Sequence, residues 1–84
     1  MRKKPFQKQS EKSVLHRFGL AIKKRREQRG WTQYEFADKS ALDQTYISLI
    51  ERGKPNPTFL VVTRLAAGLK MPTSKLCAGL ERVG

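Results

Sequence analysis

Glycine and proline divide the 84-residue chain into short segments, and this division limits its fold more than any other feature. Gly30, Gly53 and Pro72 each stop a helical pattern, and Pro55 and Pro57 keep the loop around them out of a helix. Between these breaks, apolar residues recur at the three- and four-residue spacing of an amphipathic helix. No strand-like alternation and no internal repeat competes with this period. The sequence therefore predicts an all-α fold of five short helices, at about residues 10–29, 32–40, 44–52, 58–69 and 73–80.

The second of these segments carries a strong helix start. Thr32 and Glu35 have the spacing of a capping box, and Trp31 and Phe36 have that of a hydrophobic staple. We expect Phe36 and Ala37 to face the core. Trp31 is then a core residue rather than a platform for stacked bases.

The third segment begins after a brief turn, with Asp43 as its N-cap. On a helical projection Ile47 and Ile50 lie on one side, and the other side is mostly uncharged and polar. Such a face is unusual for an exposed helix, but Gln and Thr can bond base edges in the major groove of DNA. Two short helices joined by a turn, with this outer face, predict a helix-turn-helix reader of DNA. The outer residues are Gln44, Thr45, Ser48, Leu49 and Arg52.

The charge of the chain is large and unevenly spread. The formal net charge is +11, of which residues 1–29 carry +9 and residues 30–84 carry +2. This excess predicts a polyanionic partner, nucleic acid first and an acidic membrane surface second. We interpret residues 1–12 as a basic flexible arm, either solvated or lying along DNA. Residues 13–84 form the helix-turn-helix domain, including a C-terminal dimerisation region.

Several classes of protein are excluded by composition. The chain has a single cysteine, Cys77, so no intramolecular disulfide can form. Cys77 and the single histidine, His16, are too few ligands for a structural zinc site. No phosphate-cradling glycine loop and no catalytic constellation is present. We expect no cofactor, no metal and no enzymatic activity. The chain has no apolar run that could span a bilayer and no signal peptide, which predicts a soluble cytoplasmic protein.

At the motif level, residues 26–37 and 46–53 resemble the lambda-repressor-like, Cro-type helix-turn-helix family. The resemblance continues through Pro57, Thr58 and residues 65–69, and it covers about residues 14–80. Leu42 to Ser48 are particularly similar to the controller proteins of restriction–modification systems. The family is bacterial or phage-encoded, so the resemblance implies a nucleoid-associated regulator.

The resemblance also implies roles for individual residues. Helix 44–52 would be the recognition helix, with Gln44, Thr45, Ser48 and Leu49 at base edges. Phosphates or the groove flank would be bound by Gln33, Tyr46, Arg52, Lys54 and Thr32, and Gln33 would also brace the recognition helix. Arg26 and Glu51 would form a partly buried ion pair, which is structural.

Three positions depart from the family pattern. Leu49 is apolar where a polar or small residue is common, so it either touches a thymine methyl group or does not face outward. Lys70 stands where glycine is common, and a left-handed conformation there would cost about 1 kcal/mol or more. Gly68 is expected to weaken helix 58–69 slightly.

These observations predict a homodimeric, sequence-specific transcriptional regulator of double-stranded DNA with a palindromic operator. We expect the dimer interface at Leu76, Leu80 and Val83, although these residues could instead close the core of one subunit. An antitoxin that uses the same reader is the main alternative. An RNA-binding module and a membrane-surface binder fit less well, since the apolar stripe of helix 10–29 is needed for the core. RNA polymerase is a further partner only for an activator, and no sequence feature identifies a surface for it.

Overall fold

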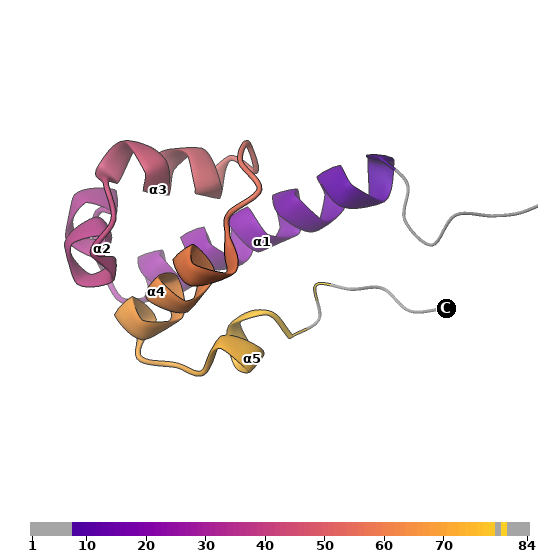
Figure 1. The fold of residues 1–84 in the computed structure, drawn as a ribbon. Coiled ribbons are helices and arrows are strands. Elements are labelled where there is room, and N and C mark those ends of the chain that lie inside the picture. Colours follow the sequence, from indigo (N-terminus) through magenta and orange to yellow (C-terminus); the bar gives the residue numbers. More distant parts are fainter. Residues whose placement is uncertain (1–7, 79, 81–84) are drawn as a thin grey trace, which may run out of the picture.

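The computed structural model describes residues 8–78 and 80, which form five helices and no strand (Figure 1). The all-α prediction is confirmed. The N-terminal boundary differs, because the first helix begins at Lys8, so residues 8–12 of the expected arm are helical. The rest of that arm, residues 1–7, lies outside the described residues. The helices are α1 (Lys8–Gln28), α2 (Gln33–Ser40), α3 (Gln44–Glu51), α4 (Phe59–Leu69) and α5 (Thr73–Leu76).

The long helix α1 runs behind the others, with α2 and α3 towards one side of the domain and α4 and α5 towards the other (Figure 1). The main packing contacts join α1 with α3, α2 with both α3 and α4, and α4 with α5. Every helix contributes at least one side chain to a single apolar core. The buried apolar residues are Phe18, Ile22, Phe36, Ala37, Ile47, Ile50, Leu65, Ala66, Leu69 and Leu76.

Side chains cap the starts of α2, α3 and α4. The capping box of α2 is present: the Glu35 amide donates to Thr32 Oγ1 at 3.0 Å, and the Thr32 amide donates to Glu35 Oε1 at 2.8 Å. Asp43 accepts a hydrogen bond from the Thr45 amide at 2.9 Å, and Thr58 accepts one from the Val61 amide at 3.2 Å. These local bonds satisfy amides that a helix leaves unpaired at its first turn, so the three starts can be predicted from sequence alone.

The ends of α2 and α4 carry backbone strain. Ala41 and Lys70 have φ angles of 56° and 58°, in the left-handed region where glycine is favoured. At Lys70 this geometry completes a helix cap, because the Lys70 amide donates to the Ala67 carbonyl and the Met71 amide to the Ala66 carbonyl, both at 3.0 Å. The left-handed backbone conformation that we considered for Lys70 on the basis of the sequence is therefore present.

Two expectations about α4 need correction, and a third concerns Leu76 of α5. The helical spacing of Phe59, Val62, Leu65, Ala66 and Leu69 predicts one apolar stripe, but Phe59 is 77% exposed, because it is the first residue of α4 and the buried residues of that helix lie towards its other end. Gly68 does more than weaken the helix. A Cβ atom there would collide with Ser40 Oγ and lie 3.2 Å from the Lys39 carbonyl, so glycine allows α4 to approach α2. Leu76, expected at a dimer interface, is 2% exposed within one subunit.

The burial of Leu76 follows from the position of α5, which folds back onto α4 and closes the core. Leu80 is half-buried and packs against the same core, and its carbonyl accepts a hydrogen bond from Arg17. Val83 lies outside the described residues. Leu76 and Leu80 therefore contribute to the core of the single subunit, which was the alternative left open by the sequence.

We predict that Ala41→Gly and Lys70→Gly each raise the free energy of unfolding by about 0.5–1 kcal/mol. Relief of left-handed strain is worth roughly 1–2 kcal/mol, and the greater freedom of glycine in the unfolded chain removes part of that gain. Urea unfolding at fixed protein concentration measures the change. Gly30→Ala is the matched control. Gly30 has a φ of +73°, and an added Cβ would meet no other part of the chain within 4 Å. This variant should therefore lower the free energy of unfolding by a similar amount, through backbone strain alone. Equal or lower stability of both glycine variants would contradict the assignment.

Candidate nucleic-acid interface

A buried ion pair holds α3 against α1. Arg26 Nε donates to Glu51 Oε2 at 2.7 Å, and Arg26 Nη2 donates to Glu51 Oε1 at 3.0 Å. The two residues are only 8% and 6% exposed, and Arg26 also donates to the Trp31 carbonyl at 2.8 Å. The hydrogen bonds to Glu51 raise the pKa of Arg26 above its ordinary value, although burial acts in the opposite direction. The ion pair that the resemblance implied is therefore present and has the two-pronged geometry that suits a guanidinium.

The same carboxylate also holds α2. Gln33 Nε2 donates to Glu51 Oε1 at 3.0 Å, so the start of α2 is joined to the end of α3. Gln33 was expected both to brace the recognition helix and to bind phosphate. The bracing contact is present in the structure, and it places the N-terminal amides of α2 next to α3.

A glycine sets the distance between α1 and α3. A Cβ atom at Gly19 would collide with the Ile50 carbonyl and lie 2.8 Å from the Glu51 carbonyl. The backbone of α1 therefore touches the last turn of α3 directly. No signal in the sequence distinguished Gly19 from any other glycine inside a helix, because the need for it arises from a contact with residues about thirty positions away.

The outer face of α3 has the polar character expected from the helical projection. Ile47 and Ile50 are buried, whereas Gln44 and Thr45 at the start of the helix are exposed. Ser48 and Leu49, on the same outer side of the helix, are half-buried.

The remaining predicted contact residues differ in their exposure. Tyr46 is half-buried and packs against the core, and Arg52 is exposed just after α3. Lys54 is exposed in the following loop. Thr32 is exposed, but its hydroxyl already accepts the Glu35 amide, so it could meet a phosphate only as a donor.

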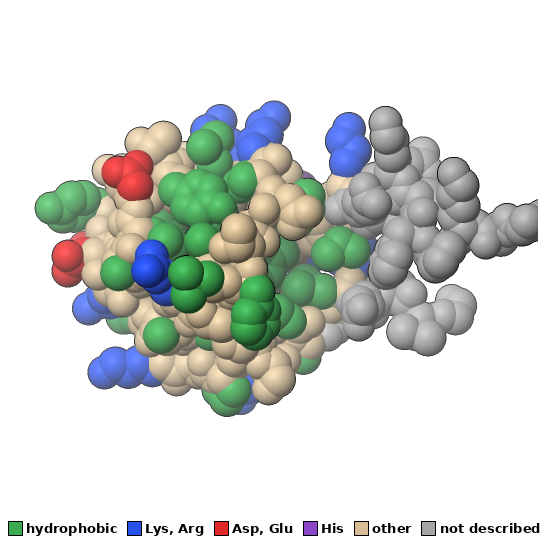
Figure 2. All heavy atoms as spheres, in the orientation of Figure 1, with side chains coloured by type: hydrophobic (Ala, Val, Ile, Leu, Met, Phe, Trp, Pro, Cys, Tyr) green, Lys and Arg blue, Asp and Glu red, His purple; other side chains and the backbone are tan. Residues whose placement is uncertain are grey.

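Four large side chains outside the predicted site are exposed, namely Leu20, Tyr34, Phe59 and Leu60, and only the last two are adjacent in the chain. Phe59 and Leu60 stand at the start of α4 and are 77% and 59% exposed. Figure 2 shows apolar side chains on the face where α4 lies in front. Two adjacent apolar residues directly after the Thr58 cap were the available sequence signal, but the helical spacing places Phe59 on the apolar stripe.

The described residues contain no group of His, Cys, Asp and Glu that could hold a metal ion. Within the same part of the chain, no helix is both long and apolar enough to cross a membrane.

Comparison with known proteins identifies the class that this geometry defines. A helix-turn-helix family model matches residues 22–76, which include α2, the turn and α3. The chain belongs to the helix-turn-helix family.

Within that family the chain is similar to restriction–modification controller proteins. It is 39% identical over 67 residues to the control protein C.MunI of Mycoplasma sp., a match that covers 79% of this chain and 90% of that protein. The crystal structure of the controller protein C.AhdI from Aeromonas hydrophila has a TM-score of 0.71 at 31% identity, covering 74% of this chain and 94% of its own. The controller protein C.Esp1396I, solved as a tetramer with its natural 35 base-pair operator, has a TM-score of 0.73 at 37% identity, covering 80% and 88%. The resemblance drawn from the motifs is confirmed.

We predict that Arg26→Met and Glu51→Leu each lower the free energy of unfolding by about 3–5 kcal/mol, because each leaves one buried charge without its partner. The double variant should lose clearly less than the sum of the two, since neither charge remains. A double-mutant cycle by urea unfolding provides the measurement. Glu51→Gln is the milder comparison, because its amide oxygen can still accept from Arg26 or Gln33. Additive losses in the cycle would show that the two side chains do not act as a pair.

Proposed function

We propose that the protein is a transcriptional regulator that binds a palindromic DNA operator as a homodimer, with α3 in the major groove. The observation that carries the proposal is the two-sided character of α3. Its inner side is fixed to α1 and α2 by apolar burial and by Glu51, and its outer side presents Gln44 and Thr45 to solvent. The operator complex of C.Esp1396I, a protein of matching fold, supports the same mode of action.

In this proposal, base recognition rests on the exposed start of α3. Gln44 can form two hydrogen bonds with adenine, and Thr45 can donate, accept or touch a thymine methyl group. Ser48 and Leu49, which are half-buried on the same side of α3, add further contacts, Leu49 through apolar contact with thymine. Residues near the N-terminal end of a recognition helix reach deepest into the groove, which favours Gln44 and Thr45 as the main specificity determinants.

Backbone phosphates are bound by the residues around α3. Gln33 opens α2, a helix N-terminus favours an anion, and the Gln33 side chain is already oriented by Glu51. Arg52 and Lys54 supply positive charge at the other end of α3, and Tyr46 and Thr32 supply hydroxyl groups. The net charge of +11 adds affinity that depends steeply on salt. The proposal places the protein with chromosomal DNA in a bacterial cytoplasm.

The antitoxin alternative finds no support in these comparisons, since the relatives described above are controller proteins. It would also require a second surface dedicated to a toxin, and no feature of the described residues calls for one.

The dimer surface of the proposal lies at the start of α4 rather than at α5. Leu76 is used by the core of one subunit, whereas Phe59 and Leu60 are large, adjacent and exposed. Burying two such side chains against a second copy is favourable by roughly 25 cal/mol per Å² of apolar surface. A two-fold pairing would place two α3 helices about 34–36 Å apart, one turn of DNA.

We predict that Gln44→Ala relaxes sequence preference at one base pair of each half-site, at a cost of about 1–3 kcal/mol in operator binding. The operator is first selected from a pool of random duplexes, and affinities are then measured by fluorescence anisotropy against single-base variants. Gln28→Ala, an exposed glutamine at the end of α1, is the matched control and should leave both affinity and preference unchanged. Failure to select any preferred sequence would overturn the proposed function.

We predict that the double variant Phe59→Ala/Leu60→Ala weakens self-association at least about tenfold, as followed by sedimentation velocity over a concentration series. Loss of apolar burial of roughly 2 kcal/mol or more accounts for this change. Leu20→Ala removes an exposed leucine from α1 and serves as the control. If the double variant dimerises as tightly as the parent chain while Leu20→Ala does not, the interface lies on α1.

A further inference from the structure

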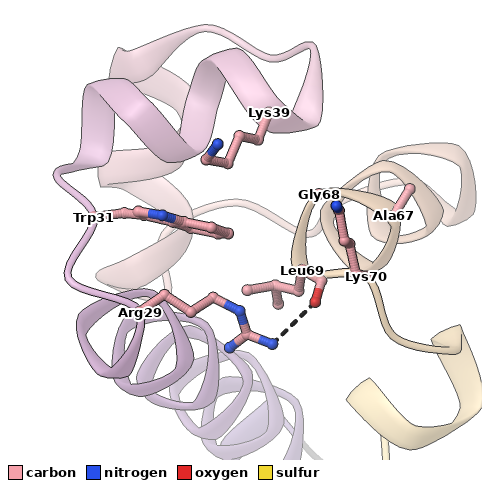
Figure 3. A pocket seen from close by; sticks show the side chains of 7 residues that line it. All are labelled: Arg29, Trp31, Lys39, Ala67, Gly68, Leu69 and Lys70. Atoms are coloured by element: carbon pink, nitrogen blue, oxygen red, sulfur yellow. Dashed lines mark hydrogen bonds between the residues drawn. The ribbon is translucent and has the colours of Figure 1, made fainter.

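A pocket of about 530 Å³ lies where the C-terminal ends of α1, α2 and α4 meet (Figure 3). Its walls come from Arg29 just after α1, Trp31, Lys39 of α2, residues 67–69 of α4, and Lys70. No residue of α3 lines it. The proposed DNA-reading face therefore does not use this pocket, and its volume falls within the range of about 300–1,000 Å³ that small-molecule sites occupy.

Two cations flank the single tryptophan of the chain. Lys39 Nζ lies 4.8 Å from the centre of the Trp31 ring and the Arg29 guanidinium lies 5.7 Å from it, on opposite faces of the ring (Figure 3). Arg29 is held in place by donating to the Leu69 carbonyl at 2.9 Å and to the Arg25 carbonyl at 3.0 Å. These bonds use two of its five N–H donors, so others remain for a ligand.

The positive charge of this pocket exceeds what the helix ends around it need. Each helix C-terminus carries at most about half a negative charge, so three of them offset roughly 1.5 of the three positive charges. Among the described residues the only salt bridge is that of Arg26 with Glu51, so Arg29, Lys39 and Lys70 have no carboxylate partner there. Glu35 and Asp38 line a neighbouring pocket of about 280 Å³, which shares Trp31 and Lys39 with this one. The lining of this pocket itself therefore holds three cations and no carboxylate.

The third cation is present despite its backbone strain. Lys70 has a φ of 58°, a conformation in which glycine would avoid a cost of about 1 kcal/mol. Its side chain stands beside α4, across the pocket from Trp31 (Figure 3). Lys70 thus adds charge to the pocket at a position where the backbone favours a residue with no side chain.

We propose that this pocket binds a phosphate-bearing anion of nucleotide size. Phosphate oxygens accept from the free N–H groups of Arg29 and from the ammonium groups of Lys39 and Lys70. The two sources of such a group are a free nucleotide or polyphosphate, and the backbone of a nucleic acid. Both faces of Trp31 are occupied by cations, so the ligand is held by its phosphates and not by a base stacked on this ring.

Isothermal titration of the full chain with ATP and with inorganic pyrophosphate, at constant ionic strength, tests this proposal. Trp31 fluorescence gives a second, local signal, because no other tryptophan is present. Lys39→Gln and Lys70→Gln each remove one cation and should weaken binding at least about tenfold. Lys75→Gln, an exposed lysine on α5, makes the same charge change outside the pocket and should alter binding less than twofold. Thermal unfolding of each variant verifies that it is folded.

A parallel titration with a mixed-sequence duplex of about 20 base pairs separates the two sources. If Lys39→Gln and Lys70→Gln weaken binding of ATP but affect the duplex no more than Lys75→Gln does, the ligand is a free phosphate compound. If they weaken the duplex more than Lys75→Gln does, the phosphate belongs to nucleic acid. The proposal is overturned if neither ATP nor pyrophosphate binds and the duplex shows no such difference. It is also overturned if all three variants weaken binding equally, which indicates general attraction to a chain of charge +11. Because Gln44→Ala leaves this pocket intact, failure of base reading and failure of the pocket can be told apart.

Discussion

One buried carboxylate, that of Glu51, determines where the recognition helix lies. It accepts two hydrogen bonds from Arg26 of α1 and one from Gln33 of α2, so three helices meet at a single group. A charge in this position is tolerated only while its partners are present, because an unpaired buried charge costs several kcal/mol. Apolar packing of Ile47 and Ile50 supplies attraction without direction, whereas these hydrogen bonds specify orientation. The orientation of the outer face of α3, which we propose contacts DNA, is therefore fixed by contacts on its inner side.

The net charge of +11 has little to do with the face that reads bases. Gln44, Thr45 and Ser48 are uncharged, while the cations stand on α1, around α3 and at the pocket beside Trp31. Long-range attraction and base recognition therefore reside in different residues. Attraction depends on the number of cations and falls with salt, whereas recognition depends on hydrogen-bond geometry that the fold maintains. This division explains why composition indicates a polyanionic partner and yet carries no information about sequence preference.

The structural features that could be predicted from the sequence are those that depend on residues close together in the chain. The caps at Thr32 and Asp43 and the breaks at Gly30 and Gly53 define the helices, because each acts within one turn. The exposure of Phe59, the burial of Leu76 and the close contact at Gly68 could not be predicted, since each depends on how distant helices pack. The Arg26–Glu51 pair spans 25 positions and was found only through the family resemblance. The cluster of Arg29, Lys39 and Lys70 has no sequence signature at all.

A domain this small cannot separate its stability from its partners. A short chain buries a modest fraction of its surface, and this one also accepts left-handed strain at Ala41 and Lys70. Phe59 and Leu60 leave apolar area outside the core, so pairing of two copies adds burial that the single subunit lacks. Any species that binds only the folded form, whether a second copy, an operator or a phosphate ligand, stabilises it in proportion to the logarithm of its concentration. Glu51 joins α1, α2 and α3, whereas the pocket joins the ends of α1, α2 and α4. Helix α2 takes part in both arrangements. Stabilising either arrangement therefore also stabilises α2, the helix that supports α3.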